Sequence, residues 1–174
     1  MSPTKRLLLL YLLCHASFLS AQEGWMVGIG PTTAPATSLI GANVRAYFGV
    51  NERFCFGPEF SFFPYQQLDD TYETSVWEIN LNAHYLFELA PRFGIYPVGG
   101  FNFSSDQERI PSTAGTLLRE TAPGINYGAG FHYNTGGVLL FTEFKGVIGA
   151  LSDEFFTIGA VFLLQKPTHH QNQN

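Results

Sequence analysis

Apolar and polar side chains alternate along residues 74–89, which read TSVWEINLNAHYLFEL. One set of alternate positions is apolar and comprises Trp77, Ile79, Leu81, Ala83, Tyr85, Phe87 and Leu89. The positions between them are mostly polar and comprise Val76, Glu78, Asn80, Asn82, His84, Leu86 and Glu88. Because successive side chains of a strand point to opposite faces of its sheet, this segment predicts a β-strand with one apolar face and one mostly polar face.

The same alternation recurs along the chain, with turn signals between its copies, and it predicts eight strands. These span approximately residues 24–30, 38–50, 53–63, 74–89, 93–103, 120–133, 137–148 and 154–164. The connections at 51–52, 90–92 and 134–136 are tight, whereas those at 31–37, 64–73 and 104–119 are long. Short turns on one rim and longer loops on the other are typical of outer-membrane barrels. We therefore expect one all-β domain, an eight-stranded antiparallel up-and-down transmembrane β-barrel.

The composition of the polar faces indicates that they line the inside of this barrel. In the second strand the polar face carries Gly41, Asn43, Arg45, Tyr47 and Gly49, and in the sixth Gly124, Asn126, Gly128, Gly130 and His132. Glycine gives a water-facing strand no solubilising group, whereas small side chains fit the narrow interior of an eight-stranded barrel. The bulky apolar faces would then contact lipid. The alternative is a secreted soluble barrel or sandwich, which would stay in solution without detergent.

The N-terminus has the pattern of a secretory signal peptide, because Lys5 and Arg6 precede the apolar run LLLLYLLC. We divide the chain into a signal peptide (1–21), the outer-membrane barrel (22–164) and a polar C-terminal tail (165–174). Cleavage leaves seven basic and fourteen acidic residues, a net charge of 7 − 14, or −7, which argues against a nucleic-acid partner. Cys55 then remains as a single cysteine, so neither an internal disulfide nor a cysteine-based zinc site is expected.

Charged residues on the polar faces suggest an ion-pair network inside the barrel, made up of Arg45, Glu59, Glu78, Glu88, Glu143 and Lys145. Paired carboxylates can carry out acid–base catalysis. However, an unpaired charge in a narrow interior is costly, and pairing with the opposite charge is the usual remedy. Two cations among four acids, with no nucleophile beside them, favour a salt-bridged plug. We expect Arg45 to pair with Glu59 or Glu78.

Uncharged polar residues share the same faces, namely Asn43, Asn80, Asn82, His84, Asn126 and His132. A lipid-modifying barrel enzyme would use a histidine with a serine near it, but neither His84 nor His132 has a His-x-Ser arrangement. We interpret both as hydrogen-bonded interior residues, and we expect no catalytic residue, no metal site and no cofactor.

The long connections concentrate acidic residues at one rim. The acidic set comprises Asp69, Asp70, Glu73, Asp106, Glu108, Glu120, Asp153 and Glu154, against Arg109 and Arg119. A solvated rim is the simplest interpretation, and binding of a cation or a basic partner is the alternative. Recognition would fall in the long connection 104–119.

The GWMVGIG opening strand, the glycine- and aromatic-rich strands and the final EFFTIGAVFLLQ resemble the small eight-stranded outer-membrane barrels of the OmpA/OmpX kind in Gram-negative bacteria. The resemblance implies a monomer in the cell outer membrane, surrounded by lipid and lipopolysaccharide and assembled by the barrel-insertion machinery. It implies a structural or surface-interaction role, with an extracellular ligand at the loops as an open question. A narrow pore is the second hypothesis and a lipid-modifying enzyme the third.

Overall fold

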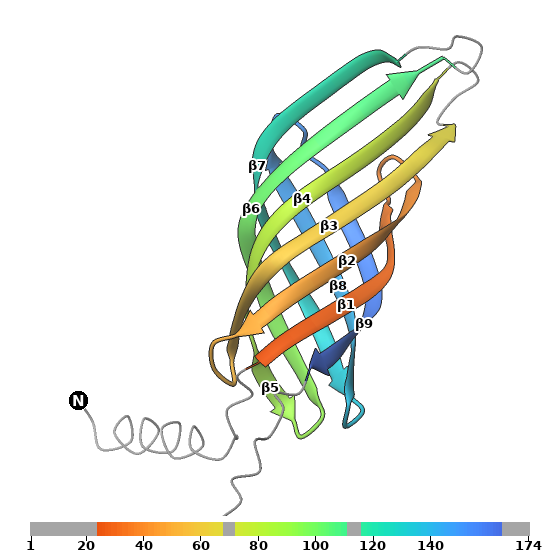
Figure 1. The fold of residues 1–174 in the computed structure, drawn as a ribbon. Coiled ribbons are helices and arrows are strands. Elements are labelled where there is room, and N and C mark those ends of the chain that lie inside the picture. The colour runs from red at the N-terminus through yellow and green to blue at the C-terminus, as the bar shows by residue number, and fades with distance from the viewer. Residues whose placement is uncertain (1–23, 68–71, 111–115, 165–174) are drawn as a thin grey trace, which may run out of the picture.

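The computed structural model describes residues 24–67, 72–110 and 116–164, which form one closed antiparallel barrel (Figure 1). Its strands are β1 (Gly24–Ala34), β2 (Leu39–Gly49), β3 (Phe54–Gln67), β4 (Glu73–Tyr85), β5 (Phe87–Ala90), β6 (Phe93–Arg109), β7 (Thr116–Asn134), β8 (Val138–Gly149) and β9 (Glu154–Leu164). Strands consecutive in the chain pair with one another except β4 and β5, which both pair with β6, and β1 pairs with β9 to close the barrel. Along the described residues where neighbouring strands overlap, closure leaves no unpaired sheet edge, as a strand structure in a bilayer requires. The extensions 63–67 of β3 and 116–123 of β7 reach beyond the paired parts of β2 and β8.

β4 and β5 are two parts of one barrel strand. His84 of β4 pairs with Val98 of β6, and three residues later Phe87 of β5 pairs with Ile95, so the register with β6 is unchanged across Leu86. The described residues thus form the eight barrel strands that the alternation predicts. The prediction of an all-β, eight-stranded antiparallel barrel is confirmed.

Several strands extend further toward the long-loop rim than predicted. β1 continues to Ala34, β3 to Gln67 and β6 to Arg109, and β7 begins at Thr116. Most of the predicted long connection 104–119 is therefore paired strand, with Asp106 opposite Glu120. The apolar alternation ends where a strand leaves hydrocarbon, but backbone pairing continues beyond that point because hydrogen bonding does not need an apolar face. In Figure 1, β3, β4, β6 and β7 rise to the upper right, above the rest of the barrel.

The register also sets the width of the barrel. Paired residues lead once around it from Leu164 through Trp25, Phe48, Phe56, Ala83, Gly99, Tyr127 and Gly146 to Glu154. The path returns to β9 ten residues from its start (164 − 154), which is the shear of the barrel. With standard strand spacings, eight strands and this shear give a strand tilt of about 40° and a backbone radius of about 8 Å. Side chains can fill such an interior.

The polarity of the outer and inner surfaces of this barrel is the reverse of that in a soluble protein. The exposed large side chains form an apolar belt that includes Ile29, Ile79, Leu81, Phe101 and Ile125. The buried side chains include Arg45, Glu59, Glu78, Glu143 and Lys145. The predicted orientation, with the apolar faces outward, is confirmed, and it is the arrangement of a transmembrane barrel. No helix among the described residues has the length and apolar character needed to cross a membrane.

Two apolar groups also lie inside. Phe141 and Val161, which fall on the nominally polar faces of the last two strands, are buried. Nearer the long-loop rim, Ala34, Leu39, Phe63, Val147 and Phe155 form a small apolar cluster. The interior is therefore a polar centre with apolar packing beside it.

We predict that Leu81→Arg destabilises the barrel by about 2 to 4 kcal/mol, because Leu81 lies midway along the outward face of the strand formed by β4 and β5. The exposed Leu118, in the polar extension of β7, is the matched control, and Leu118→Arg should cost less than about 1 kcal/mol. Unfolding by denaturant in phospholipid bilayers measures both values. Equal costs at the two positions would contradict a lipid-facing belt.

Candidate functional site

An ion pair between Arg45 of β2 and Glu143 of β8 crosses the bore. The two guanidinium nitrogens Nη1 and Nη2 donate to the two Glu143 carboxylate oxygens at 3.1 and 3.2 Å. The Arg45 Nε donates to Asn43 Oδ1 at 2.8 Å, and its guanidinium lies 4.1 Å from the centre of the Phe141 ring. Strands β1 and β9 separate β2 from β8, so this bidentate pair connects different sides of the wall.

Glu59 of β3 is the second anion of the network. Its carboxylate accepts hydrogen bonds from Lys145 Nζ at 3.3 Å, from Asn82 Nδ2 at 2.8 Å and from the Tyr47 hydroxyl. Arg45 Nη2 lies 3.7 Å from it. Two cations thus neutralise two anions, and all four charged side chains are almost completely buried. Such an arrangement offsets the cost of removing the charges from water only because each is paired and hydrogen-bonded.

The pairing differs in part from the sequence-based expectation. Arg45 forms the expected ion pair with Glu59, at 3.7 Å, but its hydrogen-bonded carboxylate is Glu143, and it forms no ion pair with Glu78. Sequence patterns assign a residue to the inside of a barrel, but they do not show which residues meet across it. That information depends on the shear.

A layer of amides continues the network toward the long-loop rim. Asn80 Oδ1 accepts from Asn102 Nδ2 at 2.7 Å and from Asn126 Nδ2 at 2.9 Å. Asn126 Nδ2 also lies 2.7 Å from Asn82 Oδ1, and Asn102 Nδ2 donates to Glu78 Oε1 at 3.0 Å. Asn102 was not predicted as a site residue, although it lies at an inward position of its strand. Side chains from β4, β6 and β7 are thereby connected, which further fills the bore.

Aromatic and histidine rings pack together toward the tight-turn rim. The ring centres of Tyr47 and His84 are 4.5 Å apart, those of His84 and Tyr96 are 4.8 Å apart, and those of Tyr96 and His132 are 6.2 Å apart. The glycine that faces Tyr96 across the ladder makes room for its ring, since a Cβ at Gly130 would lie 2.4 Å from Tyr96 Cζ. Tyr96 was not predicted from sequence, although it shares the inward face of its strand with Asn102.

Glu88 lies apart from the ion-pair network to which the sequence assigns it. Its side chain is 36% exposed at the tight-turn rim, in β5, and its Oε1 lies 3.2 Å from His132 Nε2. Here the strand reaches the end of the barrel, where inward positions open to solvent. His84 does reach the network: its Nε2 is 3.1 Å from the Tyr47 hydroxyl, 3.9 Å from Glu59 and 3.8 Å from Glu143.

Glu59, His84 and Glu143 are the one group among the described residues whose metal-ligating atoms lie close enough to share an ion, all within 4.8 Å. The surrounding charges argue against an ion there. Arg45 and Lys145 already neutralise the two carboxylates, so a divalent cation would add two uncompensated positive charges to a buried site. The three residues fit a structural role.

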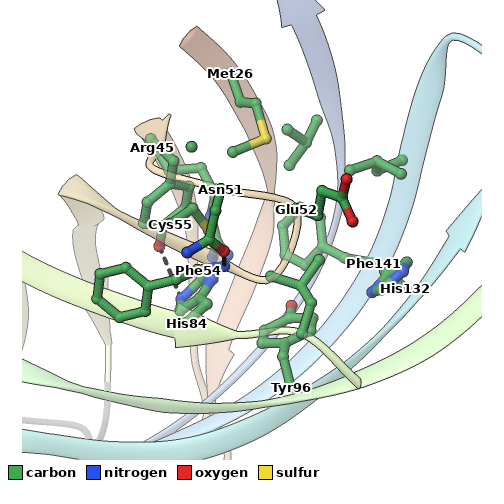
Figure 2. A pocket seen from close by; sticks show the side chains of 15 residues that line it. Met26, Arg45, Asn51, Glu52, Phe54, Cys55, His84, Tyr96, His132 and Phe141 are labelled. Atoms are coloured by element: carbon green, nitrogen blue, oxygen red, sulfur yellow. Dashed lines mark hydrogen bonds between the residues drawn. The ribbon is translucent and has the colours of Figure 1, made fainter. Parts of the chain in front are cut away.

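Two cavities flank the network and share no lining residue. The first, about 90 Å³, opens among the tight turns, and Figure 2 shows Arg45, His84, Tyr96 and His132 around it. Cys55 lines the same cavity as a buried free thiol. The second, about 210 Å³, lies at the long-loop end beside Glu78. The ion pairs and amides stand between these two spaces.

The predicted acidic rim residues lie mainly on strands and not in loops. Glu73 begins β4, Glu154 begins β9, and Asp106 and Glu108 belong to β6, whereas Asp153 lies in the connection before β9. Asp69 and Asp70 lie outside the described residues. Glu73 pairs with Arg109 at 2.8 Å. Burial raises the pKa of the Asp106 carboxyl above its ordinary value, and the neighbouring Glu108 charge adds to this shift.

We predict strong coupling between Arg45 and Glu143. Arg45→Met or Glu143→Met should each cost about 3 kcal/mol or more, because the remaining charge stays buried and unpaired, and the double variant should cost less than the sum. The matched control is the more exposed pair Arg109–Glu73, whose coupling should stay below about 1 kcal/mol. Double-mutant cycles of unfolding free energy measure both couplings. Additive costs at Arg45 and Glu143 would contradict a cooperative network.

Comparison with protein-family models and with curated proteins finds no match for the sequence. Solved structures do match. The N-terminal β-barrel domain of OprF from Pseudomonas aeruginosa is 15% identical, with a TM-score of 0.62 over 83% of this chain and 100% of that domain. Ail, the attachment invasion locus protein of Yersinia pestis, is 12% identical, with a TM-score of 0.58 over 82% of this chain and 99% of Ail.

Neisserial surface protein A matches in the same way, at 12% identity and a TM-score of 0.57 over 85% of this chain and 100% of that protein. At such identities the likeness is one of fold. The inverted surfaces described above agree with it, because an apolar exterior and a charged, hydrogen-bonded interior are what a bilayer requires of a closed barrel. The chain is a small eight-stranded antiparallel β-barrel with the fold of the OmpA-like outer-membrane proteins.

Proposed function

We propose that this protein is a sealed, monomeric, non-enzymatic barrel of the Gram-negative outer membrane that acts through its extracellular end. The observation that carries the proposal is the crossed network of Arg45, Glu59, Glu143 and Lys145 inside the bore. The signal-peptide pattern of residues 1–21, which lie outside the described residues, supports export, and lipid, lipopolysaccharide and the barrel-insertion machinery are the partners that such a location supplies. The tight-turn rim then faces the periplasm and the long-loop rim faces outward.

A narrow pore is the second candidate, and the geometry favours it less. An ion crossing the bore would have to separate Arg45 from Glu143 and Lys145 from Glu59, leaving buried charges without partners. The inward rings of Tyr47, His84 and Tyr96 narrow the path further. An enzyme acting on lipid is the least supported, because His84 and His132, the histidines among the described residues, are buried inside the barrel and so point away from lipid.

The outer rim is the part of the molecule that can meet other molecules. The strand extensions and connections there carry six described acids and two arginines: Glu73, Asp106, Glu108, Glu120, Asp153, Glu154, Arg109 and Arg119. Ail has been solved in complex with the heparin analogue sucrose octasulfate, a polyanion. The charge of the present rim is opposite to what such a ligand needs, and it suits a basic partner.

We predict that the wild-type protein gives no steady single-channel steps in planar bilayers. The triple variant Arg45→Ser, Glu59→Ser, Glu143→Ser, with folding verified by circular dichroism, should conduct because its bore has lost the bridging charges. The rim triple variant Glu73→Ser, Glu108→Ser, Arg109→Ser is the matched control and should stay silent. Steady wild-type steps whose conductance changes in the bore variant would overturn the sealed-barrel proposal, because that current would pass through the bore.

We further predict that the protein in nanodiscs of neutral lipid binds poly-lysine, loses this binding at high salt, and does not bind heparin. Replacing Glu108, Glu120 and Glu154 by glutamine should weaken poly-lysine binding at least tenfold. The control replaces the opposite-rim acids Glu52 and Glu88 by glutamine and should leave it unchanged. Heparin binding by the wild type, or equal poly-lysine binding by all variants, would count against a basic partner.

A further inference from the structure

The cavity of about 210 Å³ at the extracellular end combines acidic and apolar walls. Three carboxylates line it, from Glu78 of β4, Asp106 of β6 and Asp153 before β9. Val76, Leu151 and Phe155 supply apolar surface in the same space. Its volume is far above the ~15 Å³ that one water requires, so it can hold a molecule of several heavy atoms.

Glu78 is the residue in this cavity that needs explanation, because it is a buried acid that forms no ion pair with a described cationic side chain. Its exposed fraction is 1%. Oε1 accepts hydrogen bonds from Asn102 Nδ2 at 3.0 Å and from Ser104 Oγ at 3.2 Å. Oε2 has no hydrogen-bond partner among the described residues, and none of their cationic side chains forms an ion pair with Glu78. A buried carboxylate is costly unless it is paired.

The other two carboxylates add to the same electrostatic field. Asp106 Oδ1 is also buried and lacks a hydrogen-bond partner among the described residues. Asp106 and Asp153 are half-buried, whereas Glu78 is fully buried. The cavity therefore has carboxylates both in its partly exposed wall and at a fully buried position. Charge arranged in this way inside low-dielectric walls attracts and retains cations.

We propose that this cavity binds an aliphatic primary ammonium, with its N–H groups donating to Glu78 Oε2 and its hydrocarbon part packed against Val76, Leu151 and Phe155. An ammonium group has three donors, enough for Glu78 and for a second oxygen acceptor in the wall such as Ser104 Oγ. The site shares Asp106 and Asp153 with the rim surface that would meet a basic macromolecule, but the fully buried Glu78, on which ammonium binding depends, is not part of that surface.

A bare metal ion fits this cavity less well. Calcium takes 6–8 oxygen ligands at 2.3–2.6 Å. Glu78, Asp106 and Asp153 do not bring their oxygens within 4.8 Å of one another, because the only such group among the described residues is Glu59, His84 and Glu143. The apolar walls would also offer an ion no ligand, whereas they match the alkyl part of an amine.

The test uses the full chain in phosphatidylcholine nanodiscs, since this lipid carries no primary ammonium. Titration with n-butylammonium, followed by calorimetry, should show saturable binding, and n-butanol should bind at least tenfold more weakly. Glu78→Gln keeps the size of the side chain and should weaken n-butylammonium binding at least tenfold. Glu73→Gln is the matched control on the same strand, because Glu73 pairs with Arg109 and does not line the cavity, and it should leave the affinity unchanged.

Equal affinity of the wild type and Glu78→Gln, equal binding of n-butanol, or displacement of the amine by stoichiometric calcium would each overturn the proposal. If Glu78→Gln fails to fold by circular dichroism, Asp106→Asn provides the second variant, and it should weaken binding several-fold; unchanged affinity would again overturn it. Nα-acetyl-lysine amide distinguishes the source of the ammonium. Tighter binding than n-butylammonium supports a lysine side chain, and weaker binding supports a free amine.

Discussion

The pairing of opposite charges inside the bore is the constraint on which the rest of this barrel depends. The bilayer places hydrocarbon and not water beside the barrel wall, so burial of apolar side chains does not drive the interior together. The outer surface is apolar, and the polar side chains lie inside. Arg45 and Lys145 can be buried there only because Glu143 and Glu59 meet them, and Asn43, Asn82 and Tyr47 add hydrogen bonds to Arg45 and Glu59. The charge network replaces the hydrophobic core of a soluble domain.

Barrel width decides whether such pairing is possible. With eight strands and a shear of ten, side chains from opposite walls reach one another, as Lys145 of β8 and Glu59 of β3 do at 3.3 Å. The same narrowness requires small residues beside the large rings. Gly130 lies opposite Tyr96 and Gly94 opposite His132, where a Cβ would collide with the ring in each case. Glycine in these strands therefore follows from close packing inside the barrel.

The fold was predictable from the sequence because lipid and bore impose a strict alternation on every strand, and the segment 74–89 shows it most clearly. The strand ends were not predictable in this way. Beyond the hydrocarbon both faces are polar, so the paired residues around Asp106 and Glu120 look like a loop. The alternation predicted that Arg45 points inward, but it did not predict that Arg45 hydrogen-bonds to Glu143, because the shear determines which residues meet across the bore. Glu88 lies at an inward position of the alternation, and its side chain is partly exposed only because its strand ends at the rim.

The composition of the interior also explains why the two ends of the bore differ. The buried cations Arg45 and Lys145 are both committed to Glu59 and Glu143, so the third interior acid, Glu78, is left with amide and hydroxyl donors on one oxygen and none on the other. A third cation beside Glu78 would complete the neutralisation and close the bore more fully. Its absence from the described side chains leaves Glu78 without an ion pair beside the cavity at the long-loop end, where the proposed ammonium would supply the missing positive charge.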